Sequence, residues 1–475
     1  MRITLIKTTI KYSMIIYWHA IRRHIRYRLN SFRIMRLLFL LTCCLFIFVQ
    51  YLLTKLFYWE KKPSPLLTRL YPDMPMTIDL RSYSVCHPKK LYLDTITSYY
   101  HQYSKQQTCF LIEHLNGGPW WSYVTHEFAE VLTNLKEIGI RSNIIYRSFP
   151  QNIKFDYKTN FTKYFLNACN LDENLYMQNK IPIVILLWDI DRLLWNEMHH
   201  QWIYLLEKLQ IRILVFIDDL HFTTKESFLS RQYLFQFISS EIFSTYPYIF
   251  HNYYYSISSS KITWLPHAAS SLSYRSINRS ADNLLFISGA QIFEWYPCRS
   301  RAFHLCRSRK DLTACLKHPG YGETMKNDSS FFYGGRRYFS YMRQYVFGLG
   351  TCQSVDYAIA KLFELPANGL ALVTTNDLVP ILERLNLYHN EHFLTIQCLS
   401  VNRLIKEIKR LQNISKDKID NIRIKSQKVI YERHTTQHRA QLLHVRLLAQ
   451  ALIAMSSSDE ERTQWKQWGR YCDQY

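Results

Sequence analysis

Short apolar runs alternate with longer amphipathic segments along most of the chain. Thr108–Ile112 is apolar, and the segment Tyr123–Ile138 after it carries apolar side chains at helical spacing. Ile181–Trp188 and Ile211–Ile217 are apolar at nearly every position, which is typical of parallel strands buried on both faces. Residues 105–270 are therefore predicted to form a first Rossmann-like unit. Its predicted strands are Thr108–Ile112, Arg141–Tyr146, Ile181–Trp188, Ile211–Ile217, Ile249–Tyr254 and Ile262–Leu265.

The alternation starts again after a boundary at residues 266–281. Residues 281–400 predict a second Rossmann-like unit, and residues 401–475 predict C-terminal helices at Val401–Leu411 and Ile419–Leu452. The predicted strands of the second unit are Leu284–Ser288, Tyr345–Gly348, Leu370–Thr374 and Phe393–Leu399, and its predicted helices are Arg301–Arg307, Asp356–Leu365 and Asp377–Leu387. The predicted fold class is α/β, with two doubly wound domains that face a cleft.

The N-terminal region has the pattern of a membrane anchor. Residues 37–59 begin with 18 uncharged residues, close to the number that spans a bilayer. Residues 1–36 contain nine Lys and Arg and no acidic residue, so the positive-inside rule predicts a basic cytoplasmic tail. We expect a transmembrane signal anchor at 37–59, a proline-containing stem at 60–104 and a luminal C-terminal part. A cleaved signal peptide and a buried core helix are the alternatives.

Composition supports a large folded protein. The 475 residues are 48% hydrophobic and 20% charged, which excludes a disordered or collagen-like chain. The net charge is +22, and the chain beyond the N-terminal tail keeps 22 − 9 = +13. A basic surface suits anionic ligands such as phosphates. No motif that reads a nucleic-acid groove is evident, so we expect no nucleic-acid partner.

Two further features fit a secretory compartment. Glycosylation sequons begin at Asn160, Asn278, Asn327 and Asn413, which predicts a glycoprotein. Nine of the 11 cysteines follow the predicted anchor, and we expect one or two disulfides plus buried thiols. The spacing of Cys298, Cys306 and Cys315 does not match a zinc site. The predicted location is the Golgi or endoplasmic reticulum membrane, as a single-pass type II protein.

The segment Lys361–Thr375, KLFELPANGLALVTT, carries the strongest chemical pattern in the chain. We place Glu364 in the last turn of the predicted helix at Asp356–Leu365. A carboxylate there opposes the helix dipole, which suggests another reason for its presence. It is well suited to accept two hydrogen bonds from a ribose diol. A solvated glutamate is the alternative.

This segment resembles the sugar-nucleotide motif of GT-B glycosyltransferases, and most closely the spore maturation glycosyltransferase-like group. Lys361, Phe363, Glu364, Pro366, Ala367, Gly369 and Thr374 stand in register with the motif. The resemblance implies that Glu364 holds the donor ribose and that Gly369 lets the backbone pass close to the nucleotide. Leu284–Gly289, followed by Tyr296-Pro-Cys-Arg299, resembles the first strand and loop of the family's donor domain.

The resemblance also implies the remaining site assignments. Arg299 would meet the donor diphosphate, the first unit would bind the acceptor, and no metal or other cofactor would be bound. The expected donor-binding residues are Glu364, Gly369, Arg299, Tyr296, Lys361, Asn116, Gly117 and Gly118. The last three form a loop after the first strand, where glycine permits close backbone approach to an anion. A simple tight turn is the alternative for that loop.

Candidate catalytic residues follow strands of the first unit. Asp218, Asp219 and His221 close the strand Ile211–Ile217 and point toward the edge where parallel sheets bind ligands. His267 is a fourth candidate. Any of them is chemically able to act as a base on an acceptor hydroxyl. A structural cap, a metal site at the two aspartates and a buried structural histidine are the alternatives.

Together these patterns predict a membrane-anchored glycosyltransferase. It would transfer a sugar from a nucleotide-sugar donor to a hydroxyl on a glycan, protein or lipid acceptor. The alternative is a catalytically inactive binding or scaffold protein with the same fold in the secretory pathway. The sequence leaves open the donor sugar and base, the stereochemistry and the oligomeric state.

Overall fold

The computed structural model describes most of the chain beyond residue 89. The described residues are 90–103, 108–115, 122–140, 142–147, 160–179, 181–188, 199–218, 220, 225–270, 274–293, 296–317, 335–351 and 357–470. No helix in these ranges is long and apolar enough to cross a bilayer. The predicted cytoplasmic tail at 1–36, the predicted anchor at 37–59 and most of the predicted stem lie outside them.

A parallel sheet forms the centre of the first half. Its strand order is β2-β1-β3-β4-β5-β6, and each neighbouring pair is parallel. The side chains of β4 from Ile213 to Ile217 are all buried, which explains why this strand is apolar at every position. The bounds are β1 Cys109–Leu115, β2 Ser142–Arg147, β3 Ile183–Trp188, β4 Arg212–Ile217, β5 Glu241–Ser244 and β6 Ile262–Trp264.

Helices of the first half connect its strands or cover them. The described ones are α4 Lys90–Tyr103, α5 Ser122–Glu137, α6 Phe161–Ala168, α7 Glu173–Asn179, α9 His199–Ile203 with η3 Tyr204–Lys208, α10 Lys225–Tyr233 with η4 Leu234–Ile238, α11 Pro247–Tyr253 and η5 Ser259–Lys261. Residues 90–103, which we expected to belong to the stem, instead form α4. Its Ile96 is buried in the core of this half. Hydrophobic packing therefore extends the folded half beyond its predicted start at residue 105.

A second parallel sheet forms the other half. Its order is β11-β10-β9-β7-β8, the same relative order as the first five strands of the first sheet. The bounds are β7 Asp282–Gly289, β8 Thr313–Lys317, β9 Tyr345–Leu349, β10 Ala371–Thr374 and β11 Phe393–Thr395. Its connecting helices are α12 Pro297–Ser308, α13 Gly335–Met342, α14 Lys361–Ala367, η9 Asn376–Leu378 and α15 Val379–Arg384. The prediction of two parallel α/β halves is confirmed.

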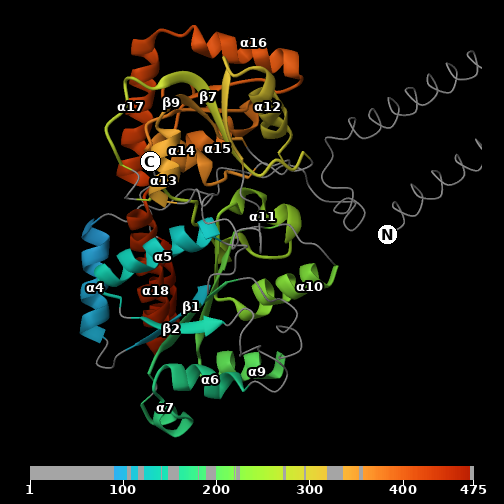
Figure 1. Ribbon diagram of the computed structural model, residues 1–475. Helices are drawn as coiled ribbons and strands as arrows, with labels where there is room; N and C mark the ends of the chain where they lie inside the picture. The colour runs from blue at the N-terminus through green and yellow to red at the C-terminus, as the bar shows by residue number, and fades with distance from the viewer. Residues whose placement is uncertain are drawn as a thin grey trace, which may run out of the picture. The chain divides into compact units, whose positions relative to one another are not determined.

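The C-terminal helices divide between the two halves. Helices α16 (Val401–Gln412) and α17 (Lys416–Arg433) pack on the second sheet, whereas α18 (Thr436–Met455) joins the core of the first. Figure 1 shows α18, in dark red, beside α4 and α5, and α18 contacts both. The last described helix, α19 (Asp459–Arg470), packs on α18. The chain thus returns to the first half after completing the second.

Two further sequence expectations differ from the structure. The predicted strand at Ile249–Tyr254 is the helix α11, which begins at Pro247 and buries most of its side chains. Burial on several faces removes the periodicity that separates a helix from a strand. The single helix predicted at Ile419–Leu452 is broken at His434, where Ala269 exchanges backbone hydrogen bonds with His434 and Thr436. Thr435 then begins α18 with a capping box.

Three disulfides lie among the described residues, more than the one or two that we expected. Cys109–Cys169 joins β1 to the end of α6, Cys298–Cys398 joins the start of α12 to the segment after β11, and Cys306–Cys315 joins α12 to β8. The pairs are 60, 100 and 9 residues apart in sequence. Such pairing depends on tertiary proximity, which spacing alone does not reveal.

Candidate functional site

The candidate site lies at the carboxyl end of β7, where the strand order of the second sheet reverses. The strand after β7 in sequence, β8, lies on one side of it, and β9 lies on the other. Connections therefore leave toward opposite sides, and ligands of open α/β sheets bind in the crevice that this creates. The loop after β7 leads into α12, and the segment after β9 leads to α14.

Arg299 reaches this point from the first turn of α12. Its side chain is buried, and Nη1 donates a hydrogen bond to the carbonyl oxygen of Ala290 at 3.1 Å. The guanidinium also lies over the Tyr296 ring, 4.0 Å from the ring centroid. Pro297 at the start of α12 fixes the backbone angle of the first turn. The predicted donor residues Arg299 and Tyr296 are thus in direct contact.

Gly289 brings Arg299 and Lys361 together. Its φ is +102°, which non-glycine residues rarely adopt. A Cβ at this position would lie 2.9 Å from Arg299 Nη1 and 3.0 Å from Lys361 Cε. Glycine therefore serves both the backbone conformation and the close approach of the two cations. We call Gly289, Arg299, Tyr338, Lys361 and Glu364 the cationic cluster.

Lys361 is the first residue of α14. Its Nζ donates a 2.6 Å hydrogen bond to the Tyr338 hydroxyl, which is 2.8 Å from the Ser288 hydroxyl. The Glu364 carboxylate lies 3.7 Å from the same Nζ. Burial lowers the pKa of the Lys361 ammonium, but the Tyr338 and Glu364 oxygens outweigh burial and the repulsion from Arg299, so the pKa is raised overall. Lys361 is therefore charged at neutral pH.

Glu364 occupies a different part of its helix from the one expected. The helix α14 begins at Lys361, so Glu364 lies in the first turn and not in the last. A carboxylate in the first turn is favourable for the helix dipole, and the dipole argument made from the sequence is wrong. The side chain is 22% exposed, which leaves its carboxylate able to reach a ligand. Glu364 remains beside Lys361.

Gly369 is not part of the cationic cluster. It lies at the opposite end of α14 with a φ of +78°, the left-handed conformation that often ends a helix. A Cβ there would lie 3.4 Å from Ile277 Cγ1. Its carbonyl oxygen accepts a 2.6 Å hydrogen bond from Arg423 Nε of α17. The described contacts thus account for this glycine through helix termination.

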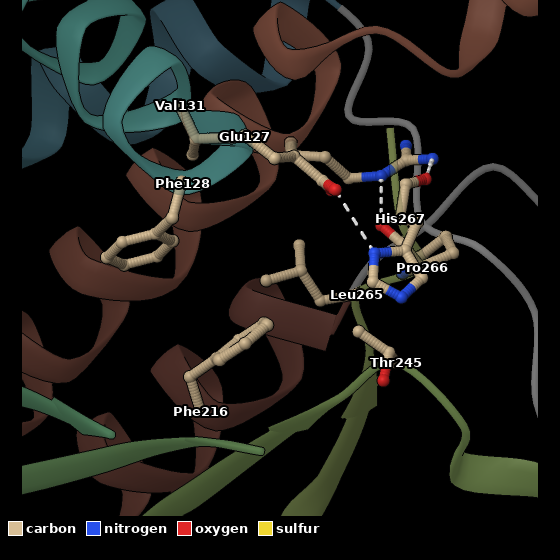
Figure 2. Close-up of a pocket in the computed structure, with 9 residues that line it drawn as sticks. Glu127, Phe128, Val131, Phe216, Thr245, Leu265, Pro266 and His267 are labelled. Atoms are coloured by element: carbon tan, nitrogen blue, oxygen red, sulfur yellow. Dashed lines mark hydrogen bonds and ion pairs between the residues drawn. The ribbon is translucent and has the colours of Figure 1, made fainter. Parts of the chain in front are cut away.

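A second polar cluster lies in the first half, at the carboxyl ends of successive strands. Asp218 follows β4 and His267 follows β6. The His267 ring lies between two carboxylates, with Nδ1 3.1 Å from Glu127 Oε2 and Nε2 3.2 Å from Asp218 Oδ1. The Tyr246 hydroxyl is 3.0 Å from the same Nε2. We call Glu127, Asp218, Tyr246 and His267 the His267 cluster; Figure 2 shows Glu127 and His267 facing one another.

The His267 cluster is built as a buried ion network. Burial disfavours the imidazolium, but Asp218 and Glu127 outweigh it, and the pKa of His267 is raised well above its usual value. Both ring nitrogens then carry protons that face partners, so the ring has no lone pair with which to accept another proton. His267 is also only 2% exposed. This geometry favours the structural alternative for His267 and Asp218 over a catalytic base.

A small cavity borders the His267 cluster, with a volume of about 20 Å³, enough for one water molecule. Its polar walls are Glu127, Thr245, His267 and Arg439, and Figure 2 shows Phe128 and Phe216 on its apolar side. The Thr245 hydroxyl lies 3.0 Å from Asp218 Oδ1. The cavity is too small for a sugar and belongs to the core.

Several predicted site residues lie outside the described residues. They are Asn116, Gly117, Gly118, Asp219 and His221, so the glycine loop and two of the candidate bases stay predictions. Sequence reasoning missed Tyr338 of the cationic cluster and Glu127 of the His267 cluster. Neither residue lies in a local sequence pattern, whereas Gly289 directly follows the predicted strand Leu284–Ser288.

No family model matches this chain, and no curated protein matches it. Solved structures do match. A glycosyltransferase from Rickettsia africae is 11% identical, with a TM-score of 0.49, over 72% of this chain and 99% of that chain. The N-terminal domain of trehalose-6-phosphate phosphatase from Candida albicans is 10% identical, with a TM-score of 0.46, over 73% and 98%. HepE from Anabaena, solved with UDP and glucose, is 9% identical, with a TM-score of 0.45, over 71% and 98%. Values this low assign no function to this chain.

Proposed function

We propose that this protein is a GT-B-type glycosyltransferase that transfers a sugar from a nucleotide-sugar donor to a hydroxyl on a glycan, protein or lipid. The observation that carries the proposal is the convergence of Arg299 and Lys361 on Gly289 at the switch point of the second sheet. Two cations held against one glycine create a site for a compact, multiply charged anion. A diphosphate has that charge and size.

We propose a role in donor binding for Arg299, Lys361 and Glu364. The planar Arg299 guanidinium suits two phosphate oxygens at once, and the Lys361 ammonium acts as a point charge beside it. Both would stabilise the charge that develops on the diphosphate when the sugar leaves. Glu364, one helical turn from Lys361, would accept hydrogen bonds from the ribose hydroxyls. The proposal needs no metal ion, because side chains supply the positive charge.

The first half would bind the acceptor, and the base remains to be assigned. Asp219 is the next residue after Asp218, and His221 lies two residues further on, after the end of β4, the edge at which such sheets bind ligands. We propose one of them as the base that activates the acceptor hydroxyl. We further propose that residues 37–59 anchor the enzyme as a type II protein of the Golgi or endoplasmic reticulum, with its catalytic part in the lumen.

A nucleotide screen tests the donor site. The melting temperature of the purified protein would be measured with UDP, GDP, ADP and CMP and with their common sugar conjugates. A ligand at about 100 times its dissociation constant stabilises the fold by roughly 2.7 kcal/mol, which shifts the melting temperature measurably. A shift with one nucleotide family is expected. The absence of any shift in a folded sample would overturn the donor site.

Glu364→Ala is the matching variant, with Glu391→Ala as its control. Glu391 is an exposed glutamate of the same half, paired with Lys425 at 2.9 Å. Both variants should keep the wild-type melting temperature within a few degrees, but only Glu364→Ala should weaken nucleotide binding. If both bind alike, Glu364 does not hold the ribose. Binding without turnover of any conjugate would favour the inactive scaffold alternative.

A further inference from the structure

The segment just before α14 is held by residues of the other half. Tyr357 is fully buried, and its ring stacks on Tyr246 with centroids 4.0 Å apart and planes 6° from parallel. Tyr246 follows β5 of the first sheet, whereas Tyr357 lies between β9 and α14 of the second. A side chain of the first half thus lies flat against the approach to the cationic cluster.

Two hydrogen bonds add to this contact. The backbone N–H of Leu220, which lies just after β4, donates to the Tyr357 hydroxyl at 3.0 Å. The backbone N–H of Ala358 donates to the Tyr248 hydroxyl of α11 at 2.8 Å. All of these atoms are buried, so losing either partner would leave a buried polar group without its hydrogen bond. Residues 357 and 358 are therefore fixed by three contacts from the first half.

The partner that stacks on Tyr357 is itself immobilised. The Tyr246 hydroxyl is 3.0 Å from His267 Nε2, and that ring is held by two carboxylates. Arg439 of α18 donates to the carbonyl oxygens of Pro266 and His267 at 2.7 and 2.9 Å. His267, held by Glu127 and Asp218, thus supports the Tyr246 hydroxyl.

Backbone hydrogen bonds connect Tyr357 to the first turn of α14, which carries Lys361 and Glu364. The N–H of Ile359 donates to the carbonyl of Tyr357, and the N–H of Glu364 donates to the carbonyl of Ala360, both at 3.0 Å. Lys361 follows Tyr357 by four residues. The N–H of Leu362 donates to the carbonyl of Ile359, also at 3.0 Å, and links these two turns. We therefore expect a displacement of Tyr357 to move the first turn of α14.

We propose that Tyr357 is a positioning residue for the donor, through which Tyr246 and the His267 cluster of the first half set the place of Lys361 and Glu364. The proposal rests on the function proposed above and extends it. In this proposal the buried His267 cluster contributes to donor binding by positioning Tyr246, and it transfers no proton. It also predicts that substitutions in the first half change nucleotide affinity although the substituted residues do not contact Lys361 or Glu364.

Affinity measurements on stack variants test the proposal. UDP, GDP and ADP would be titrated calorimetrically into the full-length wild type and into Tyr246→Leu and Tyr357→Leu. The control is Tyr345→Leu, because Tyr345 stacks on Phe286 at 5.5 Å and 5° at the other end of β9. Loss of a stack and its support should raise the nucleotide dissociation constant about tenfold in the first two variants and leave the control unchanged. Equal affinities in all four proteins would overturn the proposal.

Conservative variants show whether a loss of affinity in the leucine variants comes from the lost ring or from misfolding. Tyr357→Phe keeps the stack and loses only the hydroxyl that accepts from Leu220, and Tyr246→Phe loses only the hydroxyl that faces His267. We expect each to retain most of the nucleotide affinity lost in the leucine variants. A Tyr357→Phe variant as weak as Tyr357→Leu would contradict a role for the stacked ring.

Amide hydrogen exchange tests the contact between the halves without requiring that the protein bind a nucleotide. The exchange rates of the Phe363 and Glu364 amides would be compared in wild type, Tyr246→Leu and Tyr345→Leu without ligand. Faster exchange in Tyr246→Leu alone supports the coupling between halves, whereas equal exchange in all three refutes it. If wild type binds no nucleotide, the proposed function fails, and the exchange result still decides whether Tyr246 holds α14.

Discussion

Replacement of Lys361 by methionine is the sharpest test of the cationic cluster. Lys361→Met removes the ammonium and keeps a linear side chain of similar length beside Gly289. The Tyr338 hydroxyl loses the donor at 2.6 Å but keeps Ser288 at 2.8 Å. No buried polar atom of that pair is left without a partner. The variant should therefore fold.

The effects on stability and on binding differ in size. The pair with Glu364 is 3.7 Å long and its side chains are 16% and 22% exposed, so its loss should cost at most about 1 kcal/mol of folding free energy. A hydrogen bond from an ammonium to a diphosphate contributes about 1.5–3 kcal/mol. That range corresponds to a dissociation constant raised roughly tenfold to a hundredfold. Binding should thus fall far more than stability.

Isothermal calorimetry with the nucleoside diphosphate that stabilises wild type is the assay. Lys425→Met is the control, because Lys425 is an exposed lysine of the same half, paired with Glu391 at 2.9 Å. The control should bind as wild type does. If Lys361→Met also binds as wild type does, the diphosphate does not lie on the cationic cluster, and the reasoning from Gly289 and Arg299 is refuted.

Three further predictions concern residues with structural roles. The folded state raises the pKa of His267, so the protonated ring stabilises the fold fully below its ordinary pKa of about 6.5. This stabilisation is lost as the pH rises through the folded-state pKa. Urea unfolding between about pH 6 and 9 should show the decline in wild type and not in His267→Gln. Gly369→Ala, at a φ of +78°, should lower the unfolding free energy by about 1–2 kcal/mol and leave nucleotide affinity unchanged, and a changed affinity would return Gly369 to the donor site. Glu241→Gln should destabilise by about 3–5 kcal/mol in chemical denaturation, because Glu241 is the buried partner of Arg446; a loss below about 1 kcal/mol would show that the pair is dispensable.

Local pattern predicted much of the fold because it reports burial. Continuous apolar runs at Ile181–Trp188 and Ile211–Ile217 identified central parallel strands, since only a strand covered on both faces is apolar throughout. The same reasoning failed at Pro247–Tyr253, where a helix is buried on several faces and its periodicity disappears. It also missed the short strand Glu241–Ser244, whose apolar run is too brief to stand out.

Local patterns likewise predicted some residues of the candidate site and missed others. Arg299, Lys361 and Glu364 were predicted from the sequence because the short segments that contain them resemble motifs of a known family. Tyr338 lies 23 residues from Lys361, and its contact with that lysine leaves no local pattern. The Tyr246–Tyr357 stack joins the two halves of the fold, so no local pattern predicts it.

The sequence by itself determined the alternation of strands and helices, the two-half organisation and the positions of the charged residues, because these depend on neighbours along the chain. Only the tertiary structure decided that α14 begins at Lys361, which places Glu364 in its first turn. It also decided that α18 returns to the first half and that His267 lies between two carboxylates. The physical reason is that burial and ion pairing depend on distances in space, and residues far apart in sequence set those distances.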